Sequence, residues 1–145
     1  MPIRTSEATW LGNLASGSGN MIVGEGLFEG AYTRASRFEE GEGTNPEELL
    51  GAAHAGCYSM YLSAILSGDD HPPNSVHTTA RVHIGTVDGA PTIHTIELDT
   101  EASVPGIDQD TLLVYAERAK KECPVSKALS GVSNVEVNAR LVGEN

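Results

Sequence analysis

Two long stretches in the second half of the chain alternate hydrophobic and polar residues, which is typical of β-strands that bury one face. They cover residues 75–87 and 91–104, and the Asp88-Gly89 pair between them is typical of a tight hairpin turn. The same alternation predicts a final strand over residues 135–142. We therefore expect a long antiparallel hairpin and a separate last strand.

The first part of the chain alternates over shorter stretches that are punctuated by glycines. Residues 7–15 and 19–32 follow this pattern and predict a small antiparallel meander. We expect residues 33–38 to continue as extended chain and residues 39–44 to form a glycine-containing loop.

A helix start follows this loop. Asn45 can cap the helix, Pro46 fits the first helical position, and Glu47 and Glu48 complement the positive end of the helix dipole. The helix is expected to run from Pro46 to about Leu66. Small and apolar residues lie on nearly every face, which indicates a central, buried helix.

A second helix is predicted over residues 108–122, where hydrophobic residues recur at near-helical spacing. Cys123-Pro124 interrupts it, and a short helix over residues 124–129 follows. This order of elements predicts an α+β fold with a mainly antiparallel sheet, in a single domain over residues 1–145.

The composition narrows the function classes. The 145 residues carry a net charge of −11, which disfavours nucleic acid and anionic membranes as partners. Residues 1–10 contain no apolar run of a signal peptide, and we expect no segment with the ~18 consecutive apolar residues of a membrane span. These features predict a cytoplasmic protein, in which thiols stay reduced and two cysteines are more typical of reactive groups than of a permanent crosslink.

The two cysteines, Cys57 and Cys123, allow three interpretations. They can be unrelated buried residues that act as small hydrophobes. They can bind zinc together with His54, which shares a helix face with Cys57, although this ligand set is incomplete. They can form a redox pair, in which one thiolate attacks a substrate and the other resolves the oxidised product as a disulfide.

A redox role requires a cation, because burial in an apolar helix disfavours the reactive thiolate. Arg34 and Arg37 flank the segment before the long helix, and in an extended chain their odd separation places them on opposite faces. One of them is therefore expected to point inward. Glu47 can hold an inward arginine by a bidentate bond, whereas Glu48 is expected to stay in water.

Five segments, in order along almost the whole chain, resemble the OsmC/Ohr family. They are Ser36-Arg37-Phe38-Glu39, Gly43-Thr44-Asn45-Pro46-Glu47-Glu48-Leu49, Ala52-Ala53-His54-Ala55-Gly56-Cys57, Val104-Pro105-Gly106-Ile107-Asp108 and Cys123-Pro124-Val125-Ser126. The position of Arg37, just before the Gly-Thr-Asn-Pro-Glu run, looks like the OsmC branch. In the Ohr branch the equivalent arginine comes earlier, near the N-terminus.

The resemblance implies a cysteine-based peroxidase that reduces organic hydroperoxides, and less efficiently hydrogen peroxide, to alcohols. Cys57 matches the attacking cysteine and Cys123 the resolving one, and their intramolecular disulfide is reduced by a dithiol or by low-molecular-weight cellular thiols. Arg37 matches the arginine that lowers the thiolate pKa and binds the peroxide, and Glu47 matches the carboxylate that orients it. The implied fold has antiparallel β-sheets around long central helices in an intertwined homodimer, without a metal or organic cofactor.

The residues themselves leave some roles open. Cys123 precedes a proline at a helix start, where the helix dipole lowers a thiol pKa, so this argument favours Cys123 as the nucleophile. His54 lies one turn before Cys57 and can reach it, but a catalytic role is not its expected one. The competing functions are a protein that binds a hydrophobic ligand without catalysis and a zinc-holding stress protein.

Helix geometry predicts the assembly. Ten residues separate Glu47 from Cys57, which is about 15 Å of rise and about 80° around the axis of a straight helix. An arginine bound to Glu47 would then struggle to reach the sulfur. Either the helix breaks near Gly51, or the Arg37–Glu47 pair serves the Cys57 of a second subunit, and the small residues from Gly51 to Gly56 favour the second option.

Overall fold

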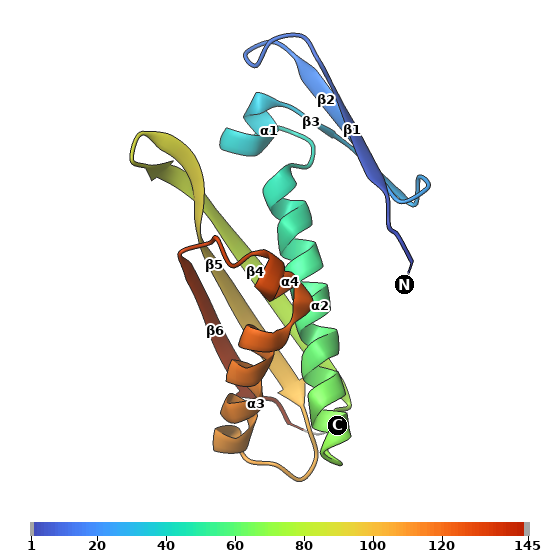
Figure 1. Ribbon diagram of the computed structural model, residues 1–145, viewed down its shortest axis with the longest axis vertical. Helices are drawn as coiled ribbons and strands as arrows, with labels where there is room; N and C mark the ends of the chain where they lie inside the picture. Colours follow the sequence, from blue (N-terminus) through green and yellow to red (C-terminus); the bar gives the residue numbers. More distant parts are fainter. Residues whose placement is uncertain (1, 144–145) are drawn as a thin grey trace. The chain divides into compact units, whose positions relative to one another are not determined.

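The computed structural model describes residues 2–143 and divides the chain into two compact units, one up to Leu49 and one from Leu50 onward. The N-terminal unit contains β1 (Ser6–Leu11), β2 (Ser18–Val23) and β3 (Phe28–Tyr32), which pair antiparallel in the order β1-β2-β3. The predicted meander is therefore confirmed and forms the blue sheet of Figure 1.

The next element, α1 (Arg34–Phe38), is a short helix, so the prediction of extended chain over residues 33–38 is wrong. Thr33 and Ser36 explain the difference by forming a reciprocal cap. The Thr33 Oγ1 atom accepts from the Ser36 N–H at 3.1 Å, and the Ser36 Oγ atom accepts from the Thr33 N–H at 2.8 Å. Arg34 and Arg37 consequently lie one helical turn apart and not on opposite faces of a strand.

The long helix α2 (Pro46–Gly68) begins as predicted, with the Asn45 Oδ1 atom accepting from the Glu48 N–H at 2.8 Å. It continues through Gly51 without a break. Its buried positions recur every three or four residues: Glu47, Gly51, His54, Tyr58, Leu62 and Leu66.

The opposite side of α2 is exposed in the single chain, and Met60 is 73% exposed there. The expectation of a helix that is buried on every side is therefore met on one face only. By length and overall apolarity, α2 alone among the helices of residues 2–143 could cross a membrane, although His54 and Ser59 interrupt its apolar residues. The α2 sequence after Glu48 contains no charged residue, so its average apolarity is high even without a long uninterrupted apolar run. A core helix of a globular protein meets the same criteria, and one such helix is weak evidence for a span.

The C-terminal unit contains a second sheet of β4 (Ser75–Val87), β5 (Ala90–Ser103) and β6 (Asn134–Leu141), in the order β4-β5-β6. The predicted hairpin is confirmed, and Asp88 and Gly89 turn it with φ values of 51° and 81°. The last strand is also where it was predicted, but it pairs with β5 in parallel. The sheet is therefore mixed, with one antiparallel and one parallel pair.

Two helices connect β5 to β6. The first, α3 (Gln109–Glu122), is capped by Asp108, whose carboxylate accepts from the Thr111 N–H at 2.8 Å. The second is α4 (Pro124–Ala128), which follows directly after Cys123. Both match the predicted helices closely.

In the C-terminal unit, α2 and α3 pack against one face of the sheet (Figure 1). The Tyr58 hydroxyl links the two helices by donating to the Ala116 carbonyl at 2.9 Å. The buried apolar core is formed by Tyr58, Leu62, Leu66, Ile96, Leu98, Ala102, Val104, Leu112, Ala116, Ala119, Cys123 and Ala139.

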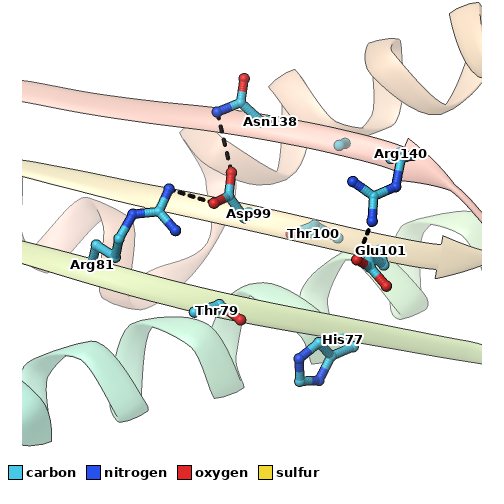
Figure 2. A pocket seen from close by; sticks show the side chains of 9 residues that line it. His77, Thr79, Arg81, Asp99, Thr100, Glu101, Asn138 and Arg140 are labelled. Atoms are coloured by element: carbon cyan, nitrogen blue, oxygen red, sulfur yellow. Dashed lines mark hydrogen bonds and ion pairs between the residues drawn. The ribbon is translucent and has the colours of Figure 1, made fainter.

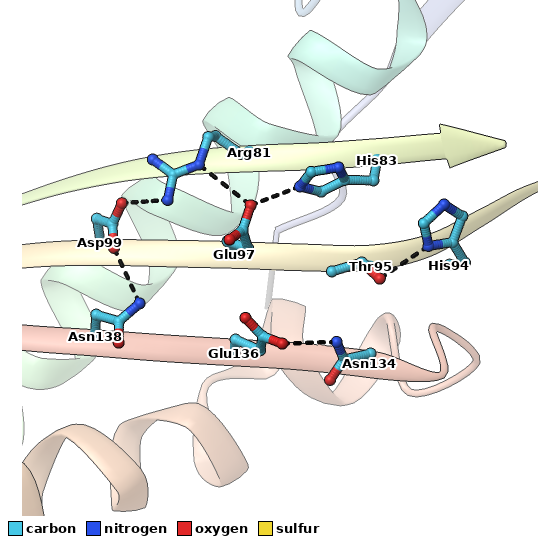
Figure 3. Close-up of polar contacts among 9 residues, drawn as sticks. All are labelled: Arg81, His83, His94, Thr95, Glu97, Asp99, Asn134, Glu136 and Asn138. Atoms are coloured by element: carbon cyan, nitrogen blue, oxygen red, sulfur yellow. Dashed lines mark hydrogen bonds and ion pairs between the residues drawn. The ribbon is translucent and has the colours of Figure 1, made fainter.

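The other face of this sheet is polar and charged. Arg81 of β4 pairs with Glu97 at 3.2 Å and with Asp99, both on β5, and His83 Nε2 lies 2.6 Å from the Glu97 carboxylate (Figure 3). A shallow cavity of about 370 Å³ lies beside these pairs, where Arg140 of β6 binds Glu101 (Figure 2). This face accounts for the polar half of the alternating pattern.

The hairpin turn gives a test of the fold. Replacing Gly89 by Ala (Gly89→Ala) should lower the free energy of unfolding by about 1 kcal/mol, because a left-handed φ of 81° penalises a side chain even in open space. Urea denaturation followed by circular dichroism measures the change. Gly131→Ala is the matched control, since Gly131 also faces open space but does not have a positive φ. Equal effects of the two substitutions would contradict the assignment of the turn.

Candidate active site

The two cysteines meet in the C-terminal unit although they are 66 positions apart in the sequence. Cys57 lies in α2 and Cys123 lies between α3 and α4; their sulfurs are 3.0 Å apart and both thiols are free. Cys123 leaves the helical conformation with a ψ of 128°, as expected for a residue that precedes a proline. The contact is therefore set by the place where Pro124 separates α3 from α4.

The two sulfurs differ in access. Cys123 is 0% exposed and belongs to the core, whereas Cys57 is only partly buried. A substrate that enters from solvent therefore reaches Cys57 first, and Cys123 can react only with a group already at Cys57.

The pKa values of the two thiols are shifted in opposite directions. Burial and the hydrogen bond with Cys123 raise the pKa of Cys57. Burial also raises the pKa of Cys123, but hydrogen bonds from Cys57, Ser126 and Val125 outweigh it and lower that pKa overall. Of these three residues, Val125 and Ser126 belong to the start of α4, and the lowered pKa agrees in direction with the helix-dipole argument from the sequence. Within the C-terminal unit, Cys123 is the more acidic thiol.

The hydrogen bond that His54 makes is to Ser126 and not to a cysteine. The His54 ring is fully buried, its Nε2 atom lies 2.7 Å from the Ser126 hydroxyl, and its Nδ1 atom has no partner among the described residues. Burial lowers the pKa of His54, so the ring is neutral at neutral pH. Sequence analysis gave no role to Ser126, which stands three residues after Cys123 in the first turn of α4 and holds the His54 ring.

Nothing in the arrangement of these residues resembles a zinc site. Across residues 2–143, no group of three or more His, Cys, Asp or Glu side chains is placed to hold a metal ion. The zinc interpretation of His54, Cys57 and Cys123 thus has no geometric support within these residues.

The N-terminal unit holds the other two predicted site residues together. Arg37 Nε and Nη2 both donate to Glu47 Oε1, at 3.0 and 2.8 Å, and Glu47 is 7% exposed. Glu47 therefore holds Arg37 as predicted, but through one oxygen and not as a bidentate pair, since Glu47 Oε2 has no partner among the described residues. Arg34 instead pairs with Glu39 at the surface, and Glu48 is exposed as expected.

A cavity of about 270 Å³ adjoins Arg37 in the same unit. Its walls are mainly apolar and include Trp10, Leu14, Tyr32 and Phe38. The Arg37 guanidinium lies 5.2 Å from the centre of the Phe38 ring, within the range of a cation–π contact. Arg34 also lines the cavity, which therefore combines the Glu47-bound Arg37 and a second arginine with a hydrophobic wall.

Comparison with known proteins gives consistent matches. The family model described as OsmC-like protein matches residues 39–138. The peroxiredoxin OsmC of Escherichia coli (strain K12) is 42% identical over 127 residues, which cover 87% of this chain and 89% of that protein. The organic hydroperoxide resistance protein of Xanthomonas axonopodis pv. citri is 32% identical over 102 residues, covering 70% of this chain and 68% of that protein.

Solved structures show the same fold at lower identity. An OsmC-like protein from Mycoplasma pneumoniae superposes with a TM-score of 0.71 and 21% identity, covering 96% of this chain and 98% of that one. The organic hydroperoxide resistance protein OhrB of Bacillus subtilis gives a TM-score of 0.68 and 23% identity, covering 95% and 98%.

Proposed function

This chain belongs to the OsmC family, and from this premise we propose a thiol-dependent peroxidase in which Cys57 reduces a hydroperoxide and Cys123 resolves the product. The observation that carries the proposal is the pair of sulfurs 3.0 Å apart, of which only Cys57 is accessible. A protein that binds a hydrophobic ligand without catalysis would have no use for this contact. The family and the contact together favour the enzyme.

The proposed cycle has three steps. The Cys57 thiolate attacks the peroxide, the O–O bond breaks, and the alcohol leaves with a proton while Cys57 becomes a sulfenic acid. The Cys123 thiolate then attacks the Cys57 sulfur, so that an S–S bond forms, the S–O bond breaks and water is released. A dithiol or a low-molecular-weight thiol reduces the intramolecular disulfide. The cycle requires no metal or organic cofactor, and we propose that it runs in the cytoplasm, where such thiols are available.

Cys57 is the attacking thiol in this proposal despite its raised pKa. Access supports the assignment, since Cys123 is closed off from solvent. The C-terminal unit raises the pKa of Cys57, so the thiolate needs a cation from elsewhere. We assign this role to Arg37, which we also propose to bind the peroxide. Glu47, which is buried, orients Arg37 by accepting hydrogen bonds from its guanidinium.

The substrate class follows from the surroundings of Arg37. A guanidinium can bind the peroxide oxygens, and the walls formed by Trp10, Leu14, Tyr32 and Phe38 suit an organic group attached to them. The name of the Xanthomonas relative, organic hydroperoxide resistance protein, supports the same class. We therefore propose organic hydroperoxides as preferred substrates, with hydrogen peroxide reduced less efficiently.

We further propose that the chain is one family domain that functions as an intertwined homodimer. The continuous course of α2 through Gly51 supports the second alternative from the sequence, since ten helical residues, about 15 Å of rise, separate Glu47 from Cys57. The exposed side of α2 carries Gly56, Met60 and Ala64, a narrow apolar surface on which a second helix can pack closely. These observations support sites in which Arg37 and Glu47 of one chain serve Cys57 of the other.

The cysteine roles predict different phenotypes for the two serine variants. Cys57→Ser should abolish consumption of cumene hydroperoxide, because the accessible sulfur is lost. Cys123→Ser should react once and stop at a sulfenic acid on Cys57, which a dimedone-type probe labels for mass spectrometry. Labelling of Cys123 in the Cys57→Ser protein, together with an inert Cys123→Ser protein, would reverse the assignment.

The two arginines of α1 form a matched pair for testing activation. Arg37→Ala should raise the pKa of Cys57 and slow the first step about tenfold or more, because burial then acts unopposed. Arg34→Ala should change the rate less than about twofold, since Arg34 forms only an exposed pair. Thiolate absorbance against pH in the Cys123→Ser background, with the rate of sulfenic acid formation, measures both effects. Equal changes of the Cys57 pKa and of the rate in the two variants would contradict the assignment of Arg37 as the residue that activates Cys57.

Subunit exchange tests the shared site. A Cys57→Ser protein and an Arg37→Ala protein are each expected to be nearly inactive. After mixing and exchange, some mixed dimers should combine an intact Arg37 from one chain with an intact Cys57 from the other and regain peroxidase activity. Light scattering checks for the dimer. A monomeric mass, or no recovery despite exchange shown by native mass spectrometry, would contradict the shared site.

A further inference from the structure

A buried hydrogen bond joins the helix of Cys57 to the short helix that follows Cys123. His54 lies in α2, one turn before Cys57, and is 0% exposed. Ser126 lies in α4, three residues after Cys123. The His54 Nε2 atom is 2.7 Å from the Ser126 hydroxyl. The proposed peroxidase cycle uses the two cysteines but gives neither partner of this hydrogen bond a role.

A second hydrogen bond joins the same two segments on the other side of the sulfurs. Tyr61 lies one turn after Cys57, and its hydroxyl donates to Glu122 Oε2 at 2.8 Å. Glu122 ends α3 and immediately precedes Cys123. Three contacts therefore follow one another along two segments of opposite chain direction: histidine with serine, sulfur with sulfur at 3.0 Å, and tyrosine with glutamate. We call the first and the third of these contacts the flanking bonds.

The segment that carries Cys123 has little stability of its own. The α4 helix contains only five residues, and no side chain among the described residues caps its start, so it depends on tertiary contacts. Val125 and Leu129 pack against the core, but apolar contact is non-directional and does not fix the rotation of a helix. A hydrogen bond has a preferred distance and angle. The flanking bonds are therefore suited to fixing the position of the Cys123 sulfur.

We propose that the flanking bonds position Cys123 against Cys57 for the second step of the peroxidase cycle. The inference rests on the proposed function, and it makes the four side chains of these bonds positioning residues, which act through the placement of the sulfurs. Both bonds are present while the thiols are still free. The segment is thus already ordered when Cys57 is oxidised, and little conformational entropy remains to be lost as the disulfide forms.

The step that the flanking bonds assist balances without any further group. The Cys123 thiolate attacks the sulfur of the Cys57 sulfenic acid, the S–S bond forms as the S–O bond breaks, and the departing hydroxide takes up a proton to become water. The Cys123 sulfur is oxidised and the Cys57 sulfur is reduced. The hydroperoxide of the first step is the only oxidant.

Another hydrogen bond of α2 provides a matched control. The Ser59 hydroxyl donates to Thr78 Oγ1 of β4 at 2.7 Å. It joins α2 to the sheet with a length similar to that of the flanking bonds, but it does not reach the segment of Cys123. Ser59→Ala should therefore weaken the packing of α2 without changing the placement of the sulfurs.

The test compares three variants of the full-length protein: Ser126→Ala and Tyr61→Phe, which each remove one flanking bond, and the control Ser59→Ala. The rate of disulfide formation after one equivalent of cumene hydroperoxide is measured by quenching with a dimedone-type probe and mass spectrometry. The equilibrium between the protein dithiol and its disulfide is measured in glutathione buffers, where the protein disulfide forms as one oxidised glutathione is reduced to two thiols.

The glutathione equilibrium also separates placement from acidity. Ser126 lowers the pKa of Cys123, so Ser126→Ala is expected to raise that pKa. A less acidic thiol makes the reduced protein less stable, which alone would shift the equilibrium towards the disulfide. Loss of placement shifts it the other way, towards the dithiol. Rates are compared at equal thiolate fraction, taken from thiolate absorbance in a Cys57→Ser background.

We expect Ser126→Ala and Tyr61→Phe each to slow disulfide formation about three- to tenfold and to shift the equilibrium towards the dithiol by a similar factor, because each loses one hydrogen bond that favours adjacent sulfurs. Ser126→Thr retains a hydroxyl and should recover most of the loss. Sulfenic acid formation at Cys57 should keep its rate in all of these variants, and Ser59→Ala should leave the rate of disulfide formation and the equilibrium unchanged.

Three results would overturn the inference in proteins with a native circular dichroism spectrum. The first is an unchanged rate and equilibrium in either Ser126→Ala or Tyr61→Phe. The second is a shift of Ser126→Ala towards the disulfide, and the third is an equal effect of Ser59→Ala. If Ser126→Ala does not fold, Tyr61→Phe still decides the inference, because it removes only a partly buried hydroxyl and keeps the ring.

The failure of this inference is distinct from a failure of the proposed function. A wild-type protein that consumes no hydroperoxide would refute the peroxidase. The glutathione equilibrium requires no peroxide, and it tests the contribution of the flanking bonds in either case.

Discussion

The contact between the two cysteines depends on where the third helix ends. Pro124 has no N–H to continue α3, and its ring disfavours the helical conformation for Cys123, which therefore turns out of the helix at ψ 128°. The chain starts again as α4, whose first residues include Val125 and Ser126, both of which lower the pKa of Cys123. Pro124 thus ends α3 next to α2, and the helix that starts after it contributes to the polar surroundings of Cys123. The hydrogen bond from Tyr58 to Ala116 holds the two longer helices at the spacing that this contact needs.

Acidity and access are divided between the two thiols. The buried sulfur has the lowered pKa, and the accessible sulfur has the raised one. A thiol that must meet substrate cannot be enclosed by donors from its own core, because the donors would also exclude the substrate. In the proposed mechanism the positive charge that stabilises the Cys57 thiolate comes from Arg37, which the buried Glu47 carboxylate holds in place. The protein can then keep the interior of the C-terminal unit free of cations.

Most elements of the fold were predictable because each has a local cause in the sequence. Asn45 with Pro46 starts α2, Asp88-Gly89 turns the hairpin, and Pro124 separates α3 from α4. The short helix α1 was missed because its cap is a Thr33–Ser36 pair, which lacks the glutamate or glutamine of the usual signature. The parallel pairing of β6 was also missed, since strand direction depends on the route of α3 and α4 across the sheet and leaves no mark in the strand itself.

A pairing of Glu47 with one inward arginine was predicted from charge and position, and the family resemblance pointed to Arg37. The bonding to a single carboxylate oxygen was not predicted. Ser126 was overlooked because a serine in a first helical turn usually has a local role. Its partner His54 is 72 positions away, a separation that no spacing rule connects. Residues that act through tertiary contacts are therefore the part of the site that sequence patterns reveal least.

The closeness of the sulfurs has a consequence for the lifetime of the protein under oxidative load. A sulfenic acid that persists can meet a second peroxide and pass to sulfinic and sulfonic acids, which thiols do not reverse. Here the partner sulfur lies 3.0 Å away before any oxidation occurs, so disulfide formation needs no unfolding of α2 or α4. Disulfide formation is therefore favoured over further oxidation of the sulfenic acid. A protein built in this way can work at high peroxide concentration without being consumed by its own substrate.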